Sequence, residues 1–218
     1  MKHKIITSND GSHTLYVLDL NEHYHSTNGA VQESMHVFIN AGLRLVTADK
    51  INILEFGFGT GLNAFLTALN KESNEIHYHS MEKYPIESSM INQLNYGDLF
   101  EGKHKELFKR LHQSNWEEEN KIKDGFYLNK QQVDFKEVRL EPKYNLIYFD
   151  AFAPDIQPKL WSKEIFERAY SSLLPGGILT TYCAKGVVRR TMQAVGFTVE
   201  RLPGPPGKRE MLRAVREN

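Results

Sequence analysis

The feature that most constrains this chain is a glycine-rich turn that directly follows a short apolar run. Residues 51–56, INILEF, have the composition of a buried strand, and glycine then occupies every second position from Gly57 to Gly61 before a helix-like segment. Glycine lacks a Cβ atom, so the backbone can approach a ligand closely, and a helix N-terminus offers free N–H groups. The dinucleotide fingerprint G-x-G-x-x-G has a different spacing. A tight turn without a ligand is the alternative, and the strand–helix–strand context disfavours it.

The rest of the chain alternates short apolar runs with helical patterns, which predicts a parallel sheet covered by helices on both faces. Residues 98–124 are polar and predict a surface helix pair or an insertion. We expect an α/β fold with a seven-stranded, mostly parallel, doubly wound sheet and an antiparallel last strand, plus an N-terminal extension over residues 1–50 with a strand at 13–20 and a helix at 29–47. The main domain covers residues 51–218, and its strands are predicted at 51–56, 75–81, 126–133, 144–150 and 177–183. Its helices are predicted at 60–70, from Pro85 onward, at 162–174 and at 185–195, and the third of these is stopped by Leu174-Pro175-Gly176-Gly177. A final antiparallel pair of strands is predicted at 197–202 and 210–215.

Acidic residues follow the predicted strands at the edge where doubly wound sheets bind ligands. Glu82 lies 21 residues beyond Gly61, where a carboxylate accepts hydrogen bonds from the ribose of either NAD or S-adenosylmethionine. Asp134 is placed to meet an adenine amino group, although a solvated loop aspartate explains it nearly as well. These acids indicate a nucleoside-containing cofactor without choosing between the two.

The stretch YFDAFAP at the end of the 144–150 strand supplies candidate catalytic residues. If the cofactor is S-adenosylmethionine and the chemistry is methyl transfer, the nucleophile has to be held at about 3–3.5 Å with a free lone pair. If the nucleophile is an amine, a carboxylate such as Asp150 can orient it and take its proton. Phe152 offers an aromatic face to a base or a sulfonium, and Pro154 stiffens the loop. A helix cap or loop role for Asp150 and a core role for Phe152 are the alternatives.

Several blocks of the sequence together resemble a known family. The G-x-G-x-G loop with Glu55 before it is similar to motif I of the S-adenosylmethionine-dependent methyltransferases, which have a Rossmann-like fold. In chain order, LEFGFGTGLN, SMEKYP, YFDAFAPDIQPKLW, LLPGGILTTYCAKGVVRRTMQAVGF and KREMLRA resemble the methyltransferase domain of the bacterial MnmC-like family, which makes 5-methylaminomethyl-2-thiouridine in tRNA. Upstream, DGSHTLY and Tyr24-His25-Ser26 with Gly29, Glu33 and Val37-Phe38 match the same family. The resemblance covers nearly the whole chain except residues 98–133.

The resemblance implies a cofactor, S-adenosyl-L-methionine, and a role for each matching residue. It places the methionine part of the cofactor beside Glu55, Gly57, Gly59 and Gly61, with Asn63 at the helix start. The ribose would meet Glu82 and Lys83, and the adenine end would meet Asp134. The transferred methyl would be bordered by Asp150, Phe152 and Pro154, with Asp150 also at the cofactor. Contacts to tRNA phosphate would come from Lys185, Arg189, Arg190, Lys208 and Arg209.

The implied reaction is the transfer of one methyl to the primary amine of a 5-aminomethyl-(2-thio)uridine at the tRNA wobble position. Many members of the family are fused to a flavin-dependent oxidase domain that uncovers this amine. No second glycine fingerprint occurs here, so we expect a form without flavin chemistry, whose substrate is supplied by an upstream enzyme.

Three further functions compete with this interpretation. Asp150-Ala151-Phe152 and the later Leu174-Pro175-Gly176-Gly177 are also similar to spermidine-synthase-type aminopropyltransferases, and a small-amine N-methyltransferase is related. An inert S-adenosylmethionine-binding module that docks a partner onto tRNA is the non-enzymatic alternative. An NAD oxidoreductase is disfavoured by the glycine spacing.

Charge is balanced overall, with 27 basic and 27 acidic residues, which excludes a strongly basic nucleic-acid-binding domain. Residues 180–218 nevertheless contain eight Lys or Arg and three Glu, a local basic excess that suits RNA phosphate or simply a solvated face. No segment approaches the roughly 18 apolar residues of a membrane span, and no apolar stretch follows the basic N-terminus. We therefore expect a cytoplasmic protein without a membrane partner.

Metal and disulfide chemistry are not expected. Cys183 is the single cysteine, which excludes an internal disulfide and an all-cysteine zinc site. The pairs His23/His25 and His77/His79 each place two imidazoles on one strand face, but no third ligand lies near them in sequence. We interpret them as surface or packed histidines.

Overall fold

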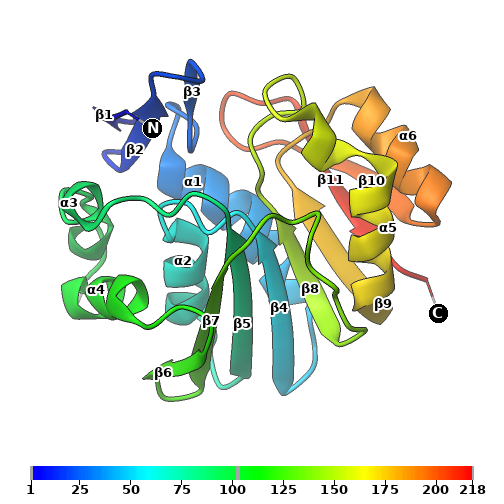
Figure 1. The fold of residues 1–218 in the computed structure, drawn as a ribbon, viewed down its shortest axis with the longest axis horizontal. Coiled ribbons are helices and arrows are strands. Elements are labelled where there is room, and N and C mark those ends of the chain that lie inside the picture. Colours follow the sequence, from blue (N-terminus) through cyan, green and yellow to red (C-terminus); the bar gives the residue numbers. More distant parts are fainter. Residues whose placement is uncertain (1, 102–103, 218) are drawn as a thin grey trace.

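The computed structural model describes residues 2–101 and 104–217. Its centre is a twisted mixed sheet with helices on both faces (Figure 1). In the described residues this sheet has eight strands in the order β10-β11-β9-β8-β4-β5-β7-β6. Their bounds are β4 (Lys50–Phe56), β5 (Glu75–Glu82), β6 (Glu119–Lys123), β7 (Phe126–Gln132), β8 (Tyr144–Phe149), β9 (Leu173–Thr181), β10 (Thr198–Pro203) and β11 (Glu210–Val215).

The five strands β7, β5, β4, β8 and β9 are parallel neighbours, and β11 is antiparallel to both β9 and β10. This confirms the doubly wound sheet and the antiparallel last strand. The parallel strands all end at one edge, where the register pairs Phe56 of β4 with Met81 of β5 and with Phe149 of β8. The residues that follow these strands, Gly57, Glu82 and Asp150, are therefore brought to the same edge.

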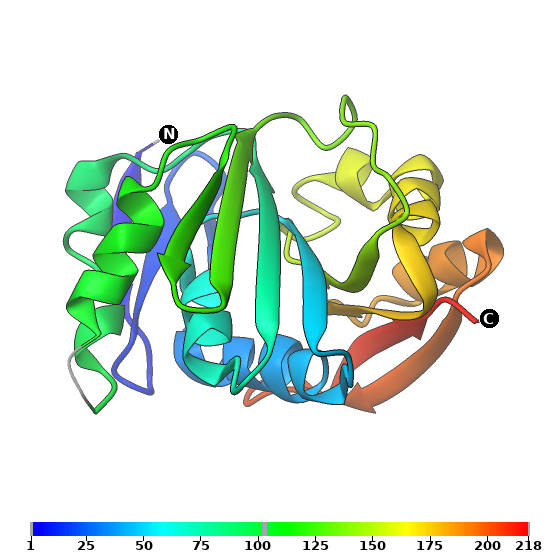
Figure 2. The same cartoon turned by 90° about the horizontal axis from the view of Figure 1, so that it is seen from below.

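Alternating side chains fill two cores, one on each face of the sheet. On β4, Ile51 and Ile53 pack into one core, and Leu54 and Phe56 pack into the other. Strands buried on both faces read as continuous apolar runs, which explains the INILEF pattern. The first face is covered by α1 (Ala30–Ser34), η1 (Met35–Asn40), η2 (Leu43–Leu45) and α2 (Leu62–Asn70). Beside them lie α3 (Ser88–Ile91), η3 (Tyr96–Asp98) and α4 (Lys105–Gln113). The second face is covered by η4 (Pro158–Trp161), α5 (Lys163–Ser172) and α6 (Gly186–Val195) (Figure 2).

The N-terminal residues form a small antiparallel sheet of β1 (His3–Thr7), β2 (His13–Val17) and β3 (Glu22–His23). In Figure 1, β3 and the loop between β10 and β11 both lie toward the upper edge of the large sheet. The helical segment that follows is buried at Val37, Phe38 and Ile39, in the same core as α2. Within the described residues no helix is long and apolar enough to span a membrane.

Within the described residues the main sheet has one strand more than predicted, because the polar segment contains a hairpin. The polar segment 98–124 contains one α-helix, α4, and the edge strand β6 in place of a helix pair. β6 turns back into β7 through Asp124 and Gly125, where Gly125 has φ of 65°. Asp-Gly between two strands is typical of a two-residue hairpin loop, in which a positive φ is required.

Three predicted helix boundaries were also wrong. The expected single helix over 29–47 is a short α-helix, a π-helical turn and a 3-10 turn, with a break at Gly42. The helix expected to open at Pro85 begins at Ser88. Finally, α5 ends at Ser172, and the Pro175-Gly176-Gly177 stop lies within β9, which begins at Leu173 and shifts its register against β8 there.

Candidate active site

The glycine loop between β4 and α2 adopts a conformation that side chains would obstruct. Gly57 has φ of 99° and Gly59 has φ of 49°, both in the left-handed region that favours glycine. A Cβ atom on Gly57 would lie 2.9 Å from the carbonyl oxygen of Asp150, and one on Gly59 would lie 3.0 Å from the ring of Tyr24. The loop is thus a bare backbone cradle, and Gly61 forms the N-cap of α2.

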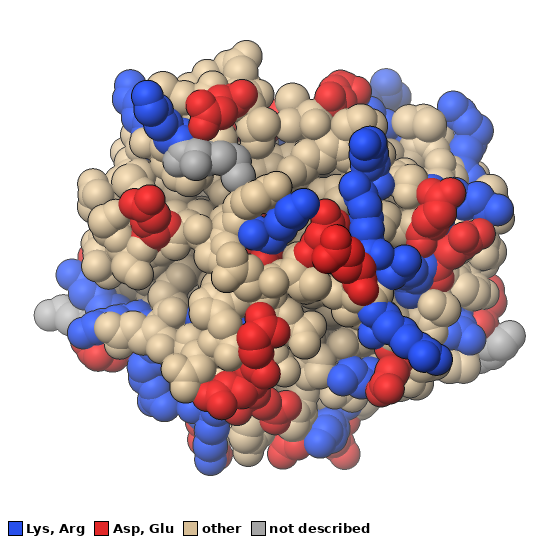
Figure 3. All heavy atoms as spheres, viewed as in Figure 1, with Lys and Arg blue, Asp and Glu red and all other residues tan. Residues whose placement is uncertain are grey.

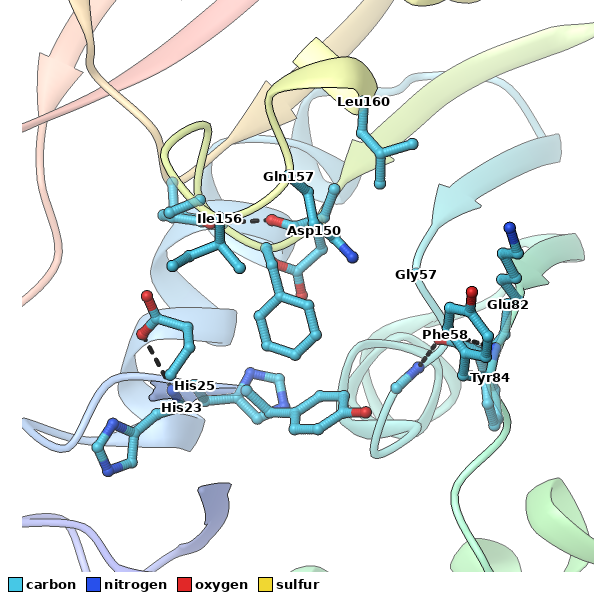
Figure 4. A pocket seen from close by; sticks show the side chains of 18 of the residues that line it. His23, His25, Gly57, Phe58, Glu82, Tyr84, Asp150, Ile156, Gln157 and Leu160 are labelled. Atoms are coloured by element: carbon cyan, nitrogen blue, oxygen red, sulfur yellow. Dashed lines mark hydrogen bonds between the residues drawn. The ribbon is translucent and has the colours of Figure 1, made fainter. Parts of the chain in front are cut away.

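Glu82 holds this cradle from the neighbouring strand. Its Oε2 accepts a hydrogen bond from the Gly59 N–H at 3.1 Å, drawn in Figure 4, and its Oε1 accepts one from the Tyr84 N–H at 2.8 Å. Burial raises the pKa of this carboxyl above its usual value, and the backbone donors act against that rise. A carboxylate at the end of the second parallel strand, beside the glycine loop, is suited to ribose hydroxyls.

A cavity of about 750 Å³ opens above the glycine loop and the strand ends (Figure 4). This volume lies within the range of roughly 300–1,000 Å³ that is typical of small-molecule sites. Of the predicted residues, the cavity brings together Gly57, Gly59, Glu82, Lys83, Asp134, Asp150, Phe152 and Lys208. It does not include Glu55, Gly61, Asn63 or Pro154 in its walls.

Asp150 directly follows β8 and lines the cavity, where Asn63 of α2 fixes its orientation. The Asn63 Nδ2 donates to Asp150 Oδ2 at 2.8 Å. Burial is the largest effect on this carboxyl and raises its pKa to about 7, while the Asn63 hydrogen bond acts in the opposite direction. A carboxyl with a pKa near neutrality, fixed in a cavity, is suited to accept a proton.

Glu55 lies behind the glycine loop, fully buried, and is not exposed to the cavity. Its Oε2 accepts a hydrogen bond from Ser80 Oγ at 2.6 Å. Burial raises its pKa to about 8, despite the Ser80 hydroxyl and the bordering side chains of Tyr78 and Asn63. Within the described residues, Glu55 Oε1, Asn63 Oδ1 and the Tyr78 hydroxyl have no hydrogen-bond partner. A neutral carboxylic acid has an O–H donor that an ionised one lacks, so this environment favours the protonated form of Glu55.

An aromatic pair forms another wall of the cavity. The rings of Tyr24 and Phe152 meet edge to face with centroids 4.9 Å apart. The Trp161 Nε1 donates to the Phe152 carbonyl at 2.8 Å and so anchors the loop after β8. Pro154 lies in this loop, half-buried, two residues beyond Phe152. The pair offers apolar surface to a planar group without closing the cavity.

An ion pair sits at the predicted adenine end. Lys83 Nζ lies 2.8 Å from Asp134 Oδ2, and both residues line the cavity. The Lys83 ammonium lowers the pKa of Asp134 from its usual value. Lys83 is half exposed, so the pair contributes little to stability, but it places an acceptor and a donor at this end of the cavity.

The residues predicted to meet tRNA are divided between the surface and the cavity. Arg190 of α6 and Arg209 of the last hairpin are exposed, and Arg189 is half-buried. Lys185 is paired with Asp155 at the surface. Figure 3 shows basic side chains with acidic side chains beside them over the face in view.

Lys208 differs from these because its ammonium is inside the cavity wall. Lys208 Nζ lies 2.6 Å from Glu33 Oε1 and 4.1 Å from the centroid of the Tyr182 ring. Glu33 and Tyr182 also line the cavity, and neither was assigned a role from the sequence. Glu33 did belong to the matching N-terminal block, which was the available signal.

Tyr24 and His25, from the same N-terminal block, likewise line the cavity without a role predicted from the sequence. His25 Nε2 lies 2.7 Å from the Thr60 hydroxyl of the glycine loop. Burial lowers the pKa of His25 to about 4, so the ring is neutral near pH 7 and links the N-terminal segment to the loop.

The described residues contain no group of three or more His, Cys, Asp or Glu able to hold a metal ion.

Comparisons with known proteins agree with this geometry. Residues 95–217 match a family model described as S-adenosyl-L-methionine-dependent methyltransferase. The chain is 30% identical over 204 residues to the tRNA 5-methylaminomethyl-2-thiouridine biosynthesis bifunctional protein MnmC of Cupriavidus necator, covering 86% of this chain and 31% of that protein. The corresponding protein of Campylobacter fetus is 29% identical, with 94% and 34% covered. The chain thus spans about a third of the length of these curated relatives.

Among solved structures, MNMC2 from Aquifex aeolicus has a TM-score of 0.81 at 23% identity, covering 98% of this chain and 70% of that one. Spermidine synthase from Thermotoga maritima has a TM-score of 0.57 at 12% identity, with 99% and 72% covered. At these identities the two likenesses show the fold alone. The glycine cradle and the Glu82 carboxylate fit an adenosine-containing cofactor, and the family match covers more than half of the chain. The chain therefore belongs to the S-adenosyl-L-methionine-dependent methyltransferase family, whose members are enzymes that use this cofactor.

Proposed function

We propose that this enzyme methylates the exocyclic amine of 5-aminomethyl-(2-thio)uridine at the wobble position of tRNA, giving 5-methylaminomethyl-(2-thio)uridine. The names of the MnmC relatives support this substrate, and their similarity extends over 86–94% of this chain. Methyl transfer to this amine requires the amine to be already present, so we propose that an upstream enzyme activity supplies the aminomethyl group.

The observation that carries the proposal is the position of Asp150. It lies in the same cavity wall as the glycine cradle and next to Phe152, with its Oδ2 held by Asn63. We propose that the carboxyl lies between the cofactor end and an aromatic surface that suits a pyrimidine ring. An amine acceptor needs a proton acceptor at this position, whereas a cofactor-binding module does not.

We assign the cofactor end to residues from three strand ends. Glu82 would hold the ribose hydroxyls, and Lys83 with Asp134 would border the adenine. The backbone of Gly57 and Gly59 would face the methionine part, while Gly61, Asn63 and Glu55 would act from behind by shaping the loop. S-adenosyl-L-methionine supplies, when bound, a methyl group on a positively charged sulfur.

At the acceptor end, the chain has to hold the amine uncharged and in line. The Asp150 carboxylate accepts the proton of the incoming ammonium, which frees the nitrogen lone pair. The freed lone pair would then face the methyl group of a bound cofactor. Asp150 would pass its first proton to water before it takes up the second proton, which the methylated amine releases. Phe152, Tyr24 and the loop that contains Pro154 would exclude water and position the base.

We place the tRNA body along the rim of the cavity. Lys136 and Lys159 line the cavity and are exposed, so they join Arg189, Arg190 and Arg209 as proposed phosphate contacts. Lys185, paired with Asp155, would exchange that partner for phosphate. Neutral overall charge and mixed surface charge predict modest tRNA affinity with a shallow salt dependence.

The test is methyl transfer from labelled S-adenosyl-L-methionine to tRNA carrying 5-aminomethyluridine, read by nucleoside mass spectrometry. One added methyl on that nucleoside is expected. Asp150→Asn should lower kcat by about 10²- to 10⁴-fold while S-adenosyl-L-methionine affinity stays within a few-fold. The wild-type rate should rise with pH through about 7, because the carboxyl must be ionised to accept a proton.

Parallel reactions separate the competing functions. Free polyamines with decarboxylated S-adenosylmethionine test aminopropyl transfer, and small amines with the intact cofactor test a small-amine methyltransferase. Product in either of these two reactions, together with no methylation of the tRNA, would contradict the proposal. Cofactor binding without turnover on any acceptor would favour a docking module.

A further inference from the structure

One ion pair in the cavity wall is unexplained by cofactor binding. Glu33 of α1 and Lys208 of the β10–β11 loop are 175 residues apart in sequence, and their charged atoms lie 2.6 Å apart. The Glu33 side chain is only 8% exposed and that of Lys208 is 34% exposed. The second carboxylate oxygen of Glu33 accepts a hydrogen bond from the Ser26 N–H at 2.9 Å. Both oxygens of this buried carboxylate are therefore engaged.

The ammonium of Lys208 also faces the ring of Tyr182 at 4.1 Å from its centroid. The Tyr182 hydroxyl donates to the carbonyl oxygen of Ala151 at 2.9 Å, in the residue directly after Asp150. A cation over an aromatic face is attracted to it, and partial burial strengthens this attraction. Lys208 is thus held by an anion on one side and by a ring fixed to the Asp150 loop on the other.

This environment does not suit a phosphate contact. The Lys208 ammonium already has an anionic partner in Glu33, whereas the neighbouring Arg209 side chain is exposed. Burying an ion pair costs desolvation energy that its own attraction often fails to repay. The pair is better explained by an effect on charge inside the cavity than by stability or by RNA affinity.

The groups that act on Asp150 come from several elements. Glu33 raises its pKa and Lys208 lowers it, in addition to the effects of burial and of Asn63. Behind the loop, Glu55 interacts with the same charge. The tyrosines Tyr78 and Tyr182 and the histidine His25 complete the titratable surroundings, and burial keeps these three neutral near pH 7. Cys183, beside Lys208, also has a pKa raised by burial. Lys208 is therefore the only cation among the groups that influence Asp150 in the described residues.

We propose that the Glu33–Lys208 pair is the charged wall of the methyl-acceptor subsite, where Lys208 offsets the charge that Glu33 presents to Asp150 and to the acceptor amine. This rests on the proposed amine acceptor. A fixed cation beside an ammonium favours loss of its proton, and the same cation favours the ionised carboxylate that receives or relays it. Glu33 neutralises Lys208 enough to make its burial tolerable and fixes its position.

The experiment titrates Asp150 directly. Carboxyl-carbon NMR of protein labelled with ¹³C-aspartate follows every aspartate against pH, and the Asp150 signal is the one lost in Asp150→Asn. Lys208→Met should raise the Asp150 pKa by about one pH unit, and Glu33→Gln should lower it by a similar amount. The double variant Glu33→Gln/Lys208→Met removes both charges and should return the value close to that of the wild type.

Activity gives a second reading of the same effect. In methyl transfer to 5-aminomethyluridine tRNA, the rising limb of kcat/KM against pH should move up by about one pH unit in Lys208→Met and return in the double variant. Arg209→Met provides the comparison for a phosphate contact. It should reduce the salt dependence of tRNA binding by about one charge and leave the Asp150 titration in place.

Several outcomes would overturn the proposal. An Asp150 titration that moves by less than about 0.2 pH unit in both single variants would do so, as would a shift in the same direction in both. So would a Lys208→Met variant that lowers the salt dependence and leaves both pH readings unmoved. The NMR titration needs no substrate. If the proposed acceptor is wrong, tRNA methylation will be absent while the Asp150 shifts remain. This result distinguishes a failure of the proposed function from a failure of the proposed charged wall.

Discussion

Replacing Glu55 with glutamine tests whether an acidic residue in the glycine motif is in fact uncharged. Glu55 is fully buried, accepts a hydrogen bond from Ser80, and has a pKa raised to about 8 by burial. Glutamine preserves its shape, and its amide offers both an acceptor for Ser80 and a permanent donor. If the folded protein contains the neutral acid, Glu55→Gln should preserve the loop and S-adenosyl-L-methionine affinity within a few-fold.

The free energy of unfolding supplies the magnitude. A carboxyl whose pKa is higher in the folded state than in the unfolded state stabilises the fold fully at low pH, and this contribution disappears as pH rises through the folded value. With a pKa of 4.5 in the unfolded chain and about 8 in the folded one, wild type should lose roughly 2–3 kcal/mol relative to Glu55→Gln between pH 5.5 and 7.5.

The assay is urea unfolding at pH 5.5, 6.5 and 7.5, followed by tryptophan fluorescence, with the free energy extrapolated to water. Glu137→Gln is the matched control because it removes a carboxyl from an exposed position, and its difference from wild type gives the baseline for the Glu55 comparison. A wild-type minus Glu55→Gln difference that is flat, or that grows with pH, would show that Glu55 is ionised in the folded protein. The reasoning from burial would then be refuted.

Two further changes probe the cradle and a buried cation. Gly59→Ala should weaken S-adenosyl-L-methionine binding about tenfold or more by calorimetry, because its Cβ would lie 3.0 Å from the Tyr24 ring in the cavity. Gly11→Ala is its control: φ is also positive, at 83°, but nothing lies within 4 Å of the new atom, so only stability should fall. Lys130→Met should lower the free energy of unfolding by about 1–3 kcal/mol in urea, because the buried Lys130 ammonium donates to two carbonyls at the end of α4 that methionine would leave unpaired. An unchanged midpoint for Lys130→Met would contradict that role.

The strand-end residues were predictable because position alone determines where they lie. Parallel strands end at one edge of a sheet, so Gly57, Glu82 and Asp150 had to meet once the alternation of strands and helices was recognised. No side-chain orientation was needed for that inference. Asp124-Gly125 is a hairpin signal in the sequence, but the polar run before it is also typical of surface helices.

Glu55 shows where position in the sequence was insufficient. It lies within β4, so its side chain must follow the alternation of the strand and point to the face shared with Ile51 and Ile53. That face is buried under α2, which places the carboxyl behind the loop and away from the cavity. Matching the motif alone assigns Glu55 to the ligand, whereas the two-residue alternation of side chains along the strand assigns it to the core.

The contacts that complete the proposed acceptor end could not be predicted, because they join opposite ends of the chain. Tyr24 packs on Phe152, and Glu33 pairs with Lys208, and such contacts depend on how a peripheral sheet and a distant hairpin dock over the same edge. We propose that the first fifty residues are for this reason a working part of the methyltransferase and more than an appendage. Their helical segment completes the core beside α2, which fixes α1, and α1 presents Glu33 to the cavity. The parallel strand ends, common to the fold, supply the cofactor end, whereas the acceptor end is formed where the N-terminal segment and the last hairpin meet. Substrate choice in this enzyme is then expected to depend on residues 22–33 and on the β10–β11 loop far more than on the glycine motif.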